Sequence, residues 1–252
     1  MLASAYGKRI YVSETATGKA LAMLEEHPDS ITALAFSPDR KKLATADGTW
    51  TVRLWEISTG KYIRSLTGHP GAVNALAFSP DSKTLASAGG TLRIWDITTG
   101  ELRHAPDKDL GSINRICFSP DGNLLATGGG WDFTGHLWDV NTGNLLKSLK
   151  SHTGEIRDIA FSPDGHTLAI ASADKTLTLW DVNTRSLRSR FPAYVDKEKM
   201  LRTKDRRKTY DVSAVKFSQD GERLVIASRA GTLHFYDVKI GQYSPTYLDI
   251  KK

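Results

Sequence analysis

Short apolar runs alternate with turn-forming residues along the whole chain. The stretch from 155 to 191 shows this most clearly, with runs at 155–162, 167–173, 176–182 and 186–191. Runs of this length separated by turn residues predict β-strands, and no segment shows a competing helical period. The chain is therefore predicted to be all-β, with antiparallel strands joined by tight turns.

One tetrapeptide, Phe-Ser-Pro-Asp, recurs at a period of roughly 40 residues. It begins at Phe36, Phe78, Phe118 and Phe161, and a variant with Gln in place of Pro begins at Phe217. Proline fixes φ and the Asp side chain can bond the backbone ahead of it, so each copy predicts a tight turn between strands.

An aromatic ladder runs in step with these turns, at Tyr11, Trp55, Trp95, Trp138, Trp180 and Tyr236. An acidic residue follows each of these aromatics except the first. The recurring tetrapeptide and the aromatic ladder together predict six units of four antiparallel strands. We place their approximate bounds at 1–24, 25–66, 67–106, 107–149, 150–191 and 192–252.

The first unit is predicted to lack its innermost strand. Its opening residues, 2–5, repeat the Leu-Ala-Ser-Ala of a second strand at 85–88. The segment 242–250 is expected to form the outer strand of the last unit, where Pro245 is tolerated at an edge. Two explanations stay open: the chain is a piece of a longer propeller protein, or the gap accepts a strand from a partner or a second copy.

A Gly-His near the start of the unit, Phe-Ser-Pro-Asp in its middle and Trp-Asp near its end resemble the WD-repeat family, most of all its regular prokaryotic members. The resemblance implies a single β-propeller domain over 1–252, with four-stranded blades around a central channel. It also implies a non-enzymatic scaffold or interaction module that binds protein or peptide partners, as part of a larger multidomain protein in many relatives.

The fifth unit contains His152, Ser172, Asp174 and Trp180, residue types that a serine hydrolase would need. No Gly-x-Ser-x-Gly elbow accompanies them, and sister units replace the same positions. The resemblance implies instead a structural hydrogen-bond network that ties the strands of one blade together. No catalytic residue is predicted, although a propeller enzyme with an unrecognised site on the top face remains an alternative.

Composition narrows the function classes further. The single cysteine, Cys117, excludes an intrachain disulfide and favours a reducing compartment, so a cytoplasmic protein without a membrane partner is expected. The seven histidines show no metal-ligand spacing, and Gly128–Gly130 lacks the Lys-Ser/Thr of a phosphate-binding loop. Neither a metal nor a cofactor is predicted.

A partner is expected at the top of the units, where the loops between second and third strands lie if each first strand runs from top to bottom. These loops vary, and variable loops on a constant scaffold usually carry specificity. The candidate partner-binding residues there are Trp50 and Trp131 in the loops and Asn74, Asn114 and Arg157 at the top of inner strands.

The insertion at 192–211 is basic and includes Lys204, Arg206, Arg207 and Lys208. A solvated loop is the simplest interpretation, and contact with an acidic protein surface or with nucleic-acid phosphates is the alternative. Nucleic-acid binding through this insertion is therefore the second function that the sequence allows. The formal net charge of +6 suits either anionic partner, and the sequence does not decide the oligomeric state.

Overall fold

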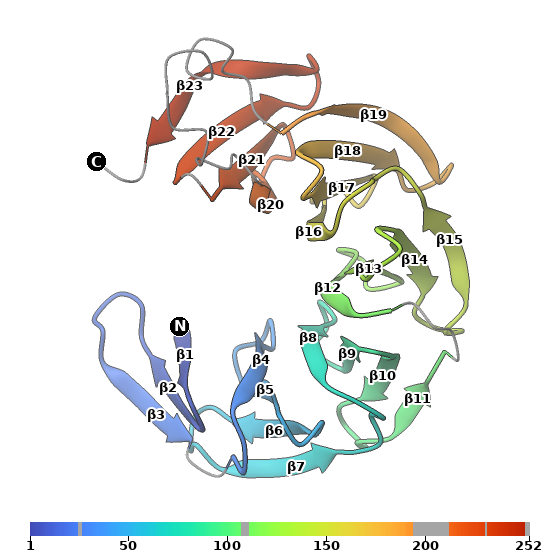
Figure 1. Ribbon diagram of the computed structural model, residues 1–252. Coiled ribbons are helices and arrows are strands. Elements are labelled where there is room, and N and C mark those ends of the chain that lie inside the picture. Colours follow the sequence, from blue (N-terminus) through green and yellow to red (C-terminus); the bar gives the residue numbers. More distant parts are fainter. Residues whose placement is uncertain (25–26, 107–110, 194–211, 230, 250–252) are drawn as a thin grey trace. The chain divides into compact units, whose positions relative to one another are not determined.

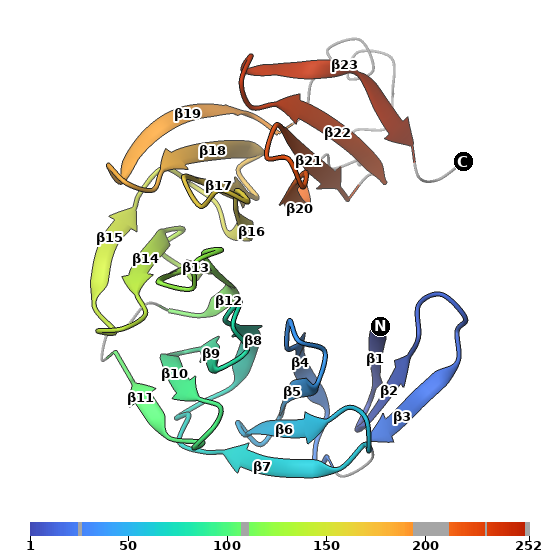
Figure 2. The ribbon, with the colours of Figure 1, turned by 180° about the vertical axis from the view of Figure 1, so that it is seen from behind.

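The computed structural model describes residues 1–24, 27–106, 111–193, 212–229 and 231–249 of the chain. Within these ranges the regular elements are β-strands, with no helix among them. The described strands form six antiparallel sheets that succeed one another along the sequence (Figures 1 and 2). The all-β, repeat-built fold predicted from the sequence is confirmed.

The first sheet has three described strands, β1 (Leu2–Tyr6), β2 (Arg9–Ser13) and β3 (Ala20–Leu24), in the order β1-β2-β3. Residues 31–36 and 73–78 supply an additional inner strand to the next two sheets, whereas in the first sheet the innermost described strand is β1. The prediction of a first unit without its innermost strand is therefore confirmed for the described residues.

Each of the other sheets has four described strands in chain order. The second contains β4 (Ile31–Phe36), β5 (Lys42–Asp47), β6 (Val52–Glu56) and β7 (Tyr62–Leu66). The third contains β8 (Val73–Phe78), β9 (Thr84–Gly89), β10 (Leu92–Asp96) and β11 (Leu102–His104). The fourth contains β12 (Ile113–Phe118), β13 (Leu124–Gly129), β14 (Gly135–Asp139) and β15 (Leu145–Leu149).

The last two sheets follow the same order. The fifth contains β16 (Ile156–Phe161), β17 (Thr167–Ser172), β18 (Thr176–Asp181) and β19 (Ser186–Pro192). The sixth contains β20 (Val212–Phe217), β21 (Arg223–Ser228), β22 (Thr232–Asp237) and β23 (Gln242–Asp249). The chain divides into two compact units, one of Met1–Leu125 with Trp138–Leu146 and one of Ala126–Leu137 with Lys147–Lys252.

The Ser-Pro-Asp turns, and the Ser-Gln-Asp turn of the sixth sheet, join the first two strands of each four-stranded sheet by the same set of hydrogen bonds. In the second sheet the Ser37 hydroxyl donates to Asp39 (2.6 Å) and accepts from the Lys42 N–H (2.9 Å). The hydrogen bond from Ser37 also holds the pKa of Asp39 below its usual value. Arg40, the next residue, has φ 60°, a left-handed conformation that a glycine adopts in three of the sister turns.

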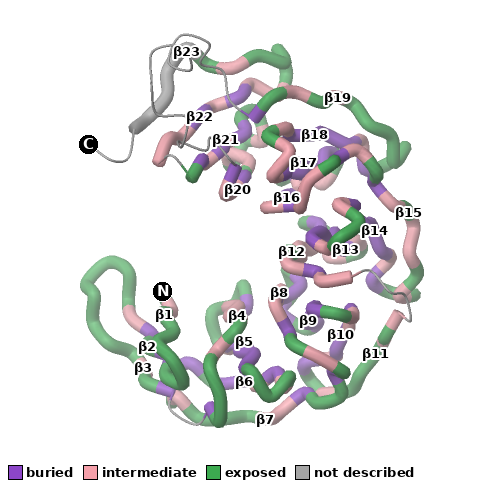
Figure 3. Tube along the Cα trace, viewed as in Figure 1, coloured by how far each residue is buried: buried purple, intermediate pink, exposed green. Residues whose placement is uncertain are grey.

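The second and third strands form the core of the sheets. Every residue of β9 and β17 is buried, whereas β19 and β11 of the fourth strands are largely exposed (Figure 3). In the first compact unit, Trp55 and Leu43 pack against Ile10 and Val12 of the first sheet. A sheet of this kind has two apolar faces, so stacking one sheet on the next is what buries them.

The strand register corrects one position of the aromatic ladder. Tyr11 pairs with Ser4 and is 42% exposed, whereas Ser13 stands where the second sheet has Trp55. The residue after Ser13, Glu14, donates its N–H to Lys19 across the next turn, as Glu56 does to Lys61. The first unit therefore has a serine in the tryptophan position, because spacing from the turn, and not residue type, sets the register.

Candidate functional site

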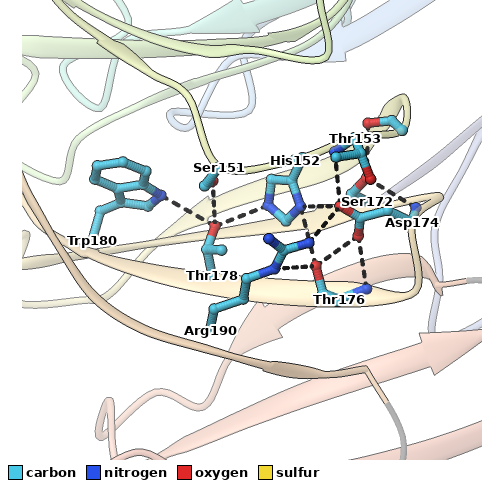
Figure 4. Close-up of polar contacts among 10 residues, drawn as sticks. Ser151, His152, Thr153, Ser172, Asp174, Thr176, Thr178, Trp180 and Arg190 are labelled. Carbon is cyan, nitrogen blue, oxygen red and sulfur yellow. Dashed lines mark hydrogen bonds and ion pairs between the residues drawn. The ribbon is translucent and has the colours of Figure 1, made fainter.

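A buried chain of hydrogen bonds crosses the fifth sheet (Figure 4). Trp180 Nε1 donates to the Thr178 hydroxyl (3.1 Å), and His152 Nε2 lies 2.9 Å from the same oxygen. The other ring nitrogen of His152, Nδ1, lies 3.0 Å from Asp174 Oδ2. The structure thus brings His152, Asp174 and Trp180 into one network, as the sequence suggests.

The Asp174 carboxylate determines which ring nitrogen of His152 carries the proton. An ionised carboxylate only accepts, so His152 Nδ1 carries the proton and Nε2 accepts from Thr178. Burial alone would raise the pKa of Asp174, but hydrogen bonds from Thr176, Thr153 and His152 hold it at about 2. Burial lowers the pKa of His152, so the ring is neutral at pH 7.

The hydroxyl between His152 and Trp180 belongs to Thr178 and not to Ser172. This finding corrects the predicted network, which included Ser172. Its Oγ donates to the Gly154 carbonyl (2.8 Å) and accepts from the Asp174 N–H (3.1 Å), so it secures the loop instead. Ser172 makes no hydrogen bond with His152 in the described structure, and the two are not arranged as nucleophile and base.

The other sheets explain why Thr178 was missed. The second sheet joins His27 to Trp55 through Thr45 (2.8 and 3.0 Å), and Thr45 is on the second strand. The register places Ile170 at the corresponding position of the fifth sheet, so the second strand has no hydroxyl to offer there. Thr178, two residues before the tryptophan, supplies the hydroxyl from the third strand. In the sequence, Ile170 at the position of Thr45 was the sign that the hydroxyl must come from another strand.

The third sheet repeats the second-strand arrangement. His69 Nε2 lies 2.6 Å from Ser87 Oγ, which accepts from Trp95 Nε1 (2.8 Å). Burial, and then the nearby Arg93 charge, lowers the pKa of His69 to about 4. These buried polar groups satisfy one another, which makes them structural links within a sheet.

Among the predicted partner-binding residues that the structure describes, Trp131 is the most exposed. It lies in the loop between β13 and β14 and is 86% exposed. The next residue, Asp132, lines a pocket of about 400 Å³ together with Thr134, Lys150, Ser151 and His152. An indole this exposed gains nothing from the protein's own core, so it is available for contact.

Trp50 lies in the loop between β5 and β6 and is 49% exposed. Its φ is 62°, in the left-handed region that a bulky side chain seldom adopts. The Trp50 N–H donates to the Asp47 carbonyl (3.0 Å), so the turn itself holds this conformation.

The predicted polar residues of the inner strands have partners within the chain. Asn74 Nδ2 donates to Ser112 (3.1 Å) and to Asn114 (3.2 Å), which links β8 to β12. Arg157 forms an ion pair with Glu155 (3.0 Å). Lys204, Arg206, Arg207 and Lys208 lie outside the described residues.

The described residues contain no group of three or more His, Cys, Asp or Glu side chains placed to hold a metal ion. They likewise include no helix that is long and apolar enough to cross a membrane.

The repeated sheets, with their His–hydroxyl–Trp links, define a WD-repeat β-propeller chain. The chain belongs to the family described as the IFT122 first beta-propeller, whose model matches residues 1–189. A model of the WD domain, G-beta repeat, matches residues 199–237. Propellers of this type generally serve as non-enzymatic scaffolds for protein interactions. A search of curated proteins found no match.

Proposed function

We propose that this chain is a non-enzymatic protein-interaction module that binds a protein or peptide partner through the loops joining second and third strands. Trp131 carries the proposal, because it is 86% exposed and the next residue, Asp132, lines a pocket. Large aromatic side chains beside a recess are the residues that most often dominate binding energy.

Trp50 supports the same use of these loops. A left-handed, half-exposed tryptophan carries a backbone cost of about 1–2 kcal/mol that the fold does not recover by burying the indole. Strain of this kind is common where a side chain is held ready for a ligand.

The experiment compares the wild-type chain with Trp131→Ala and Trp50→Ala for proteins captured from an extract of the source cells. Ile240→Ala is the matched control, because Ile240 is 70% exposed but lies in the turn between β22 and β23. Each variant should keep its unfolding free energy to within about 0.5 kcal/mol, since the side chains are exposed. The proteins retained by wild type and by the control should be lost by Trp131→Ala. Retention of the same proteins by all four chains would refute the proposal.

We further propose that the protein works in the cytoplasm. The support is its cysteine usage, a single Cys117, which suits a reducing compartment. Imaging of a tagged full-length protein in its own cells tests this, and a secreted or periplasmic signal would contradict it.

A further inference from the structure

Arg93 in the third sheet occupies the position of Arg53 in the second sheet, but only Arg53 has an acidic partner among the described residues. In the second sheet Arg53 of β6 forms an ion pair with the buried Asp47. The register places Arg93 of β10 at the position of Arg53, and Gly89 at the position of Asp47. Glycine cannot neutralise the guanidinium, so Arg93 lacks the acidic partner that Arg53 has.

Arg93 is not compensated elsewhere in the described structure. Its Nε is buried and has no hydrogen-bond partner, and no described carboxylate forms an ion pair with it. A buried donor without an acceptor costs about as much as a lost hydrogen bond, and more when the group is charged. Arg93 lies directly across from Ser87, the hydroxyl that holds His69.

The fifth sheet shows how a carboxylate fits in this environment. Asp174 accepts there from His152 Nδ1 (3.0 Å) and from the Thr176 hydroxyl (2.6 Å), with Arg190 Nη2 at 3.3 Å. Thr176 Oγ1 also lies 3.3 Å from His152 Nδ1. A histidine, a threonine hydroxyl and an arginine thus surround one carboxylate.

The third sheet has the same three residue types, with its arginine on the third strand and not on the fourth. Thr91 Oγ1 lies 3.5 Å from His69 Nδ1, and Arg93 provides the guanidinium. Ser87 accepts from Trp95, so its own proton is free to bond His69 Nε2, which leaves the proton of the neutral ring on Nδ1. The residue types match those around Asp174, but this turn, Gly89 to Thr91, contains no acidic residue.

The two glycines of this turn differ in the space around them. A Cβ on Gly89 would lie 1.7 Å from the Ala72 carbonyl oxygen, so the chain cannot place an acidic side chain there. A Cβ on Gly90 would meet no atom within 4 Å, so the space beside the turn is open.

We propose that His69, Thr91 and Arg93 bind the carboxylate of an Asp or Glu side chain on an acidic segment of the partner protein. The inference rests on the proposed function, because the partner supplies the carboxylate. Arginine is suited to the task, since its planar fork bonds both oxygens of a carboxylate. The formal charge of +6 favours the approach of an acidic segment.

The test uses the full chain, isotopically labelled for NMR, and a synthetic peptide of alternating Gly and Glu. The matched peptide has Gln in place of Glu, and acetate is the small-anion probe. The Arg93 Nε–H and His69 ring signals should shift with the Glu peptide at millimolar concentration, and not with the Gln peptide. Arg93→Gln should weaken Glu-peptide binding by roughly tenfold or more, the effect of losing a charge-assisted hydrogen bond. Arg40→Gln removes the same charge at an exposed turn and should leave binding within about twofold.

A second variant keeps the test decisive if Arg93→Gln unfolds. Thr91→Asp supplies an internal carboxylate at the residue whose hydroxyl lies 3.5 Å from His69 Nδ1, so it should stabilise the fold and abolish peptide binding. Equal shifts with the Gln peptide, or no shift with either the Glu peptide or acetate, would overturn the inference. If an identified partner binds Arg93→Gln as tightly as wild type but is lost by Trp131→Ala, the inference fails while the proposed function stands.

Discussion

Replacing Thr178 by valine should reveal how much the buried hydrogen-bond chain contributes to the fifth sheet. Valine has nearly the shape of threonine, and Thr178 is 0% exposed, so the change removes a hydroxyl without opening a cavity. Trp180 Nε1 then loses its acceptor and His152 Nε2 its donor. Each unsatisfied buried group costs about 1–3 kcal/mol, so for two groups we expect the free energy of unfolding to fall by about 2–6 kcal/mol.

A compensating change makes this prediction specific. Ile170→Thr places a hydroxyl in the column where the second sheet has Thr45 and the third has Ser87. In wild type this change should destabilise, because it buries a second hydroxyl beside Thr178. In the Thr178→Val background the new hydroxyl can bond Trp180, so the cost should shrink or reverse. We expect a coupling free energy of about 1–3 kcal/mol between the two positions.

Urea unfolding of the four chains, followed by tryptophan fluorescence and circular dichroism, measures this coupling. Both probes are needed because two compact units can unfold in separate steps. Additive costs for the two substitutions would refute the view that either strand can supply the hydroxyl. A loss of less than about 0.5 kcal/mol in Thr178→Val would refute the assigned role of Thr178.

Two further predictions concern turns and pH. Arg40→Gly should stabilise by up to about 1 kcal/mol because it relieves a left-handed arginine, whereas Gly165→Ala, at φ 76°, should destabilise by a similar amount; unchanged urea midpoints in both would contradict the turn argument. Burial, reinforced by Arg53 and Arg93 respectively, lowers the pKa of His27 and His69 from 6.5 to about 4. Between these values the unfolded chain binds protons that the folded chain does not, so stability is full above about pH 6.5 and falls as the pH drops. Unfolding at pH 7 and pH 5 should differ by about 1 kcal/mol for each histidine, and equal stabilities would show that these rings are not buried as neutral groups.

The sequence by itself determined the repeat and therefore the class of fold. Phe-Ser-Pro-Asp turns and the aromatic ladder act locally, since a proline, an aspartate and their neighbours define a turn without help from distant residues. The missing inner strand of the first unit was visible for the same reason, because residues 2–5 match a second strand.

Only the tertiary structure decided which side chains meet across strands. A shift of register changes every cross-strand neighbour, so Tyr11 could not be told from Ser13 by residue type alone. The choice between Ser172 and Thr178 depended likewise on which strand presents its hydroxyl to His152. The unpaired Arg93 was hidden too, because its lack of a carboxylate shows only when Gly89 is aligned with Asp47 through the paired strands.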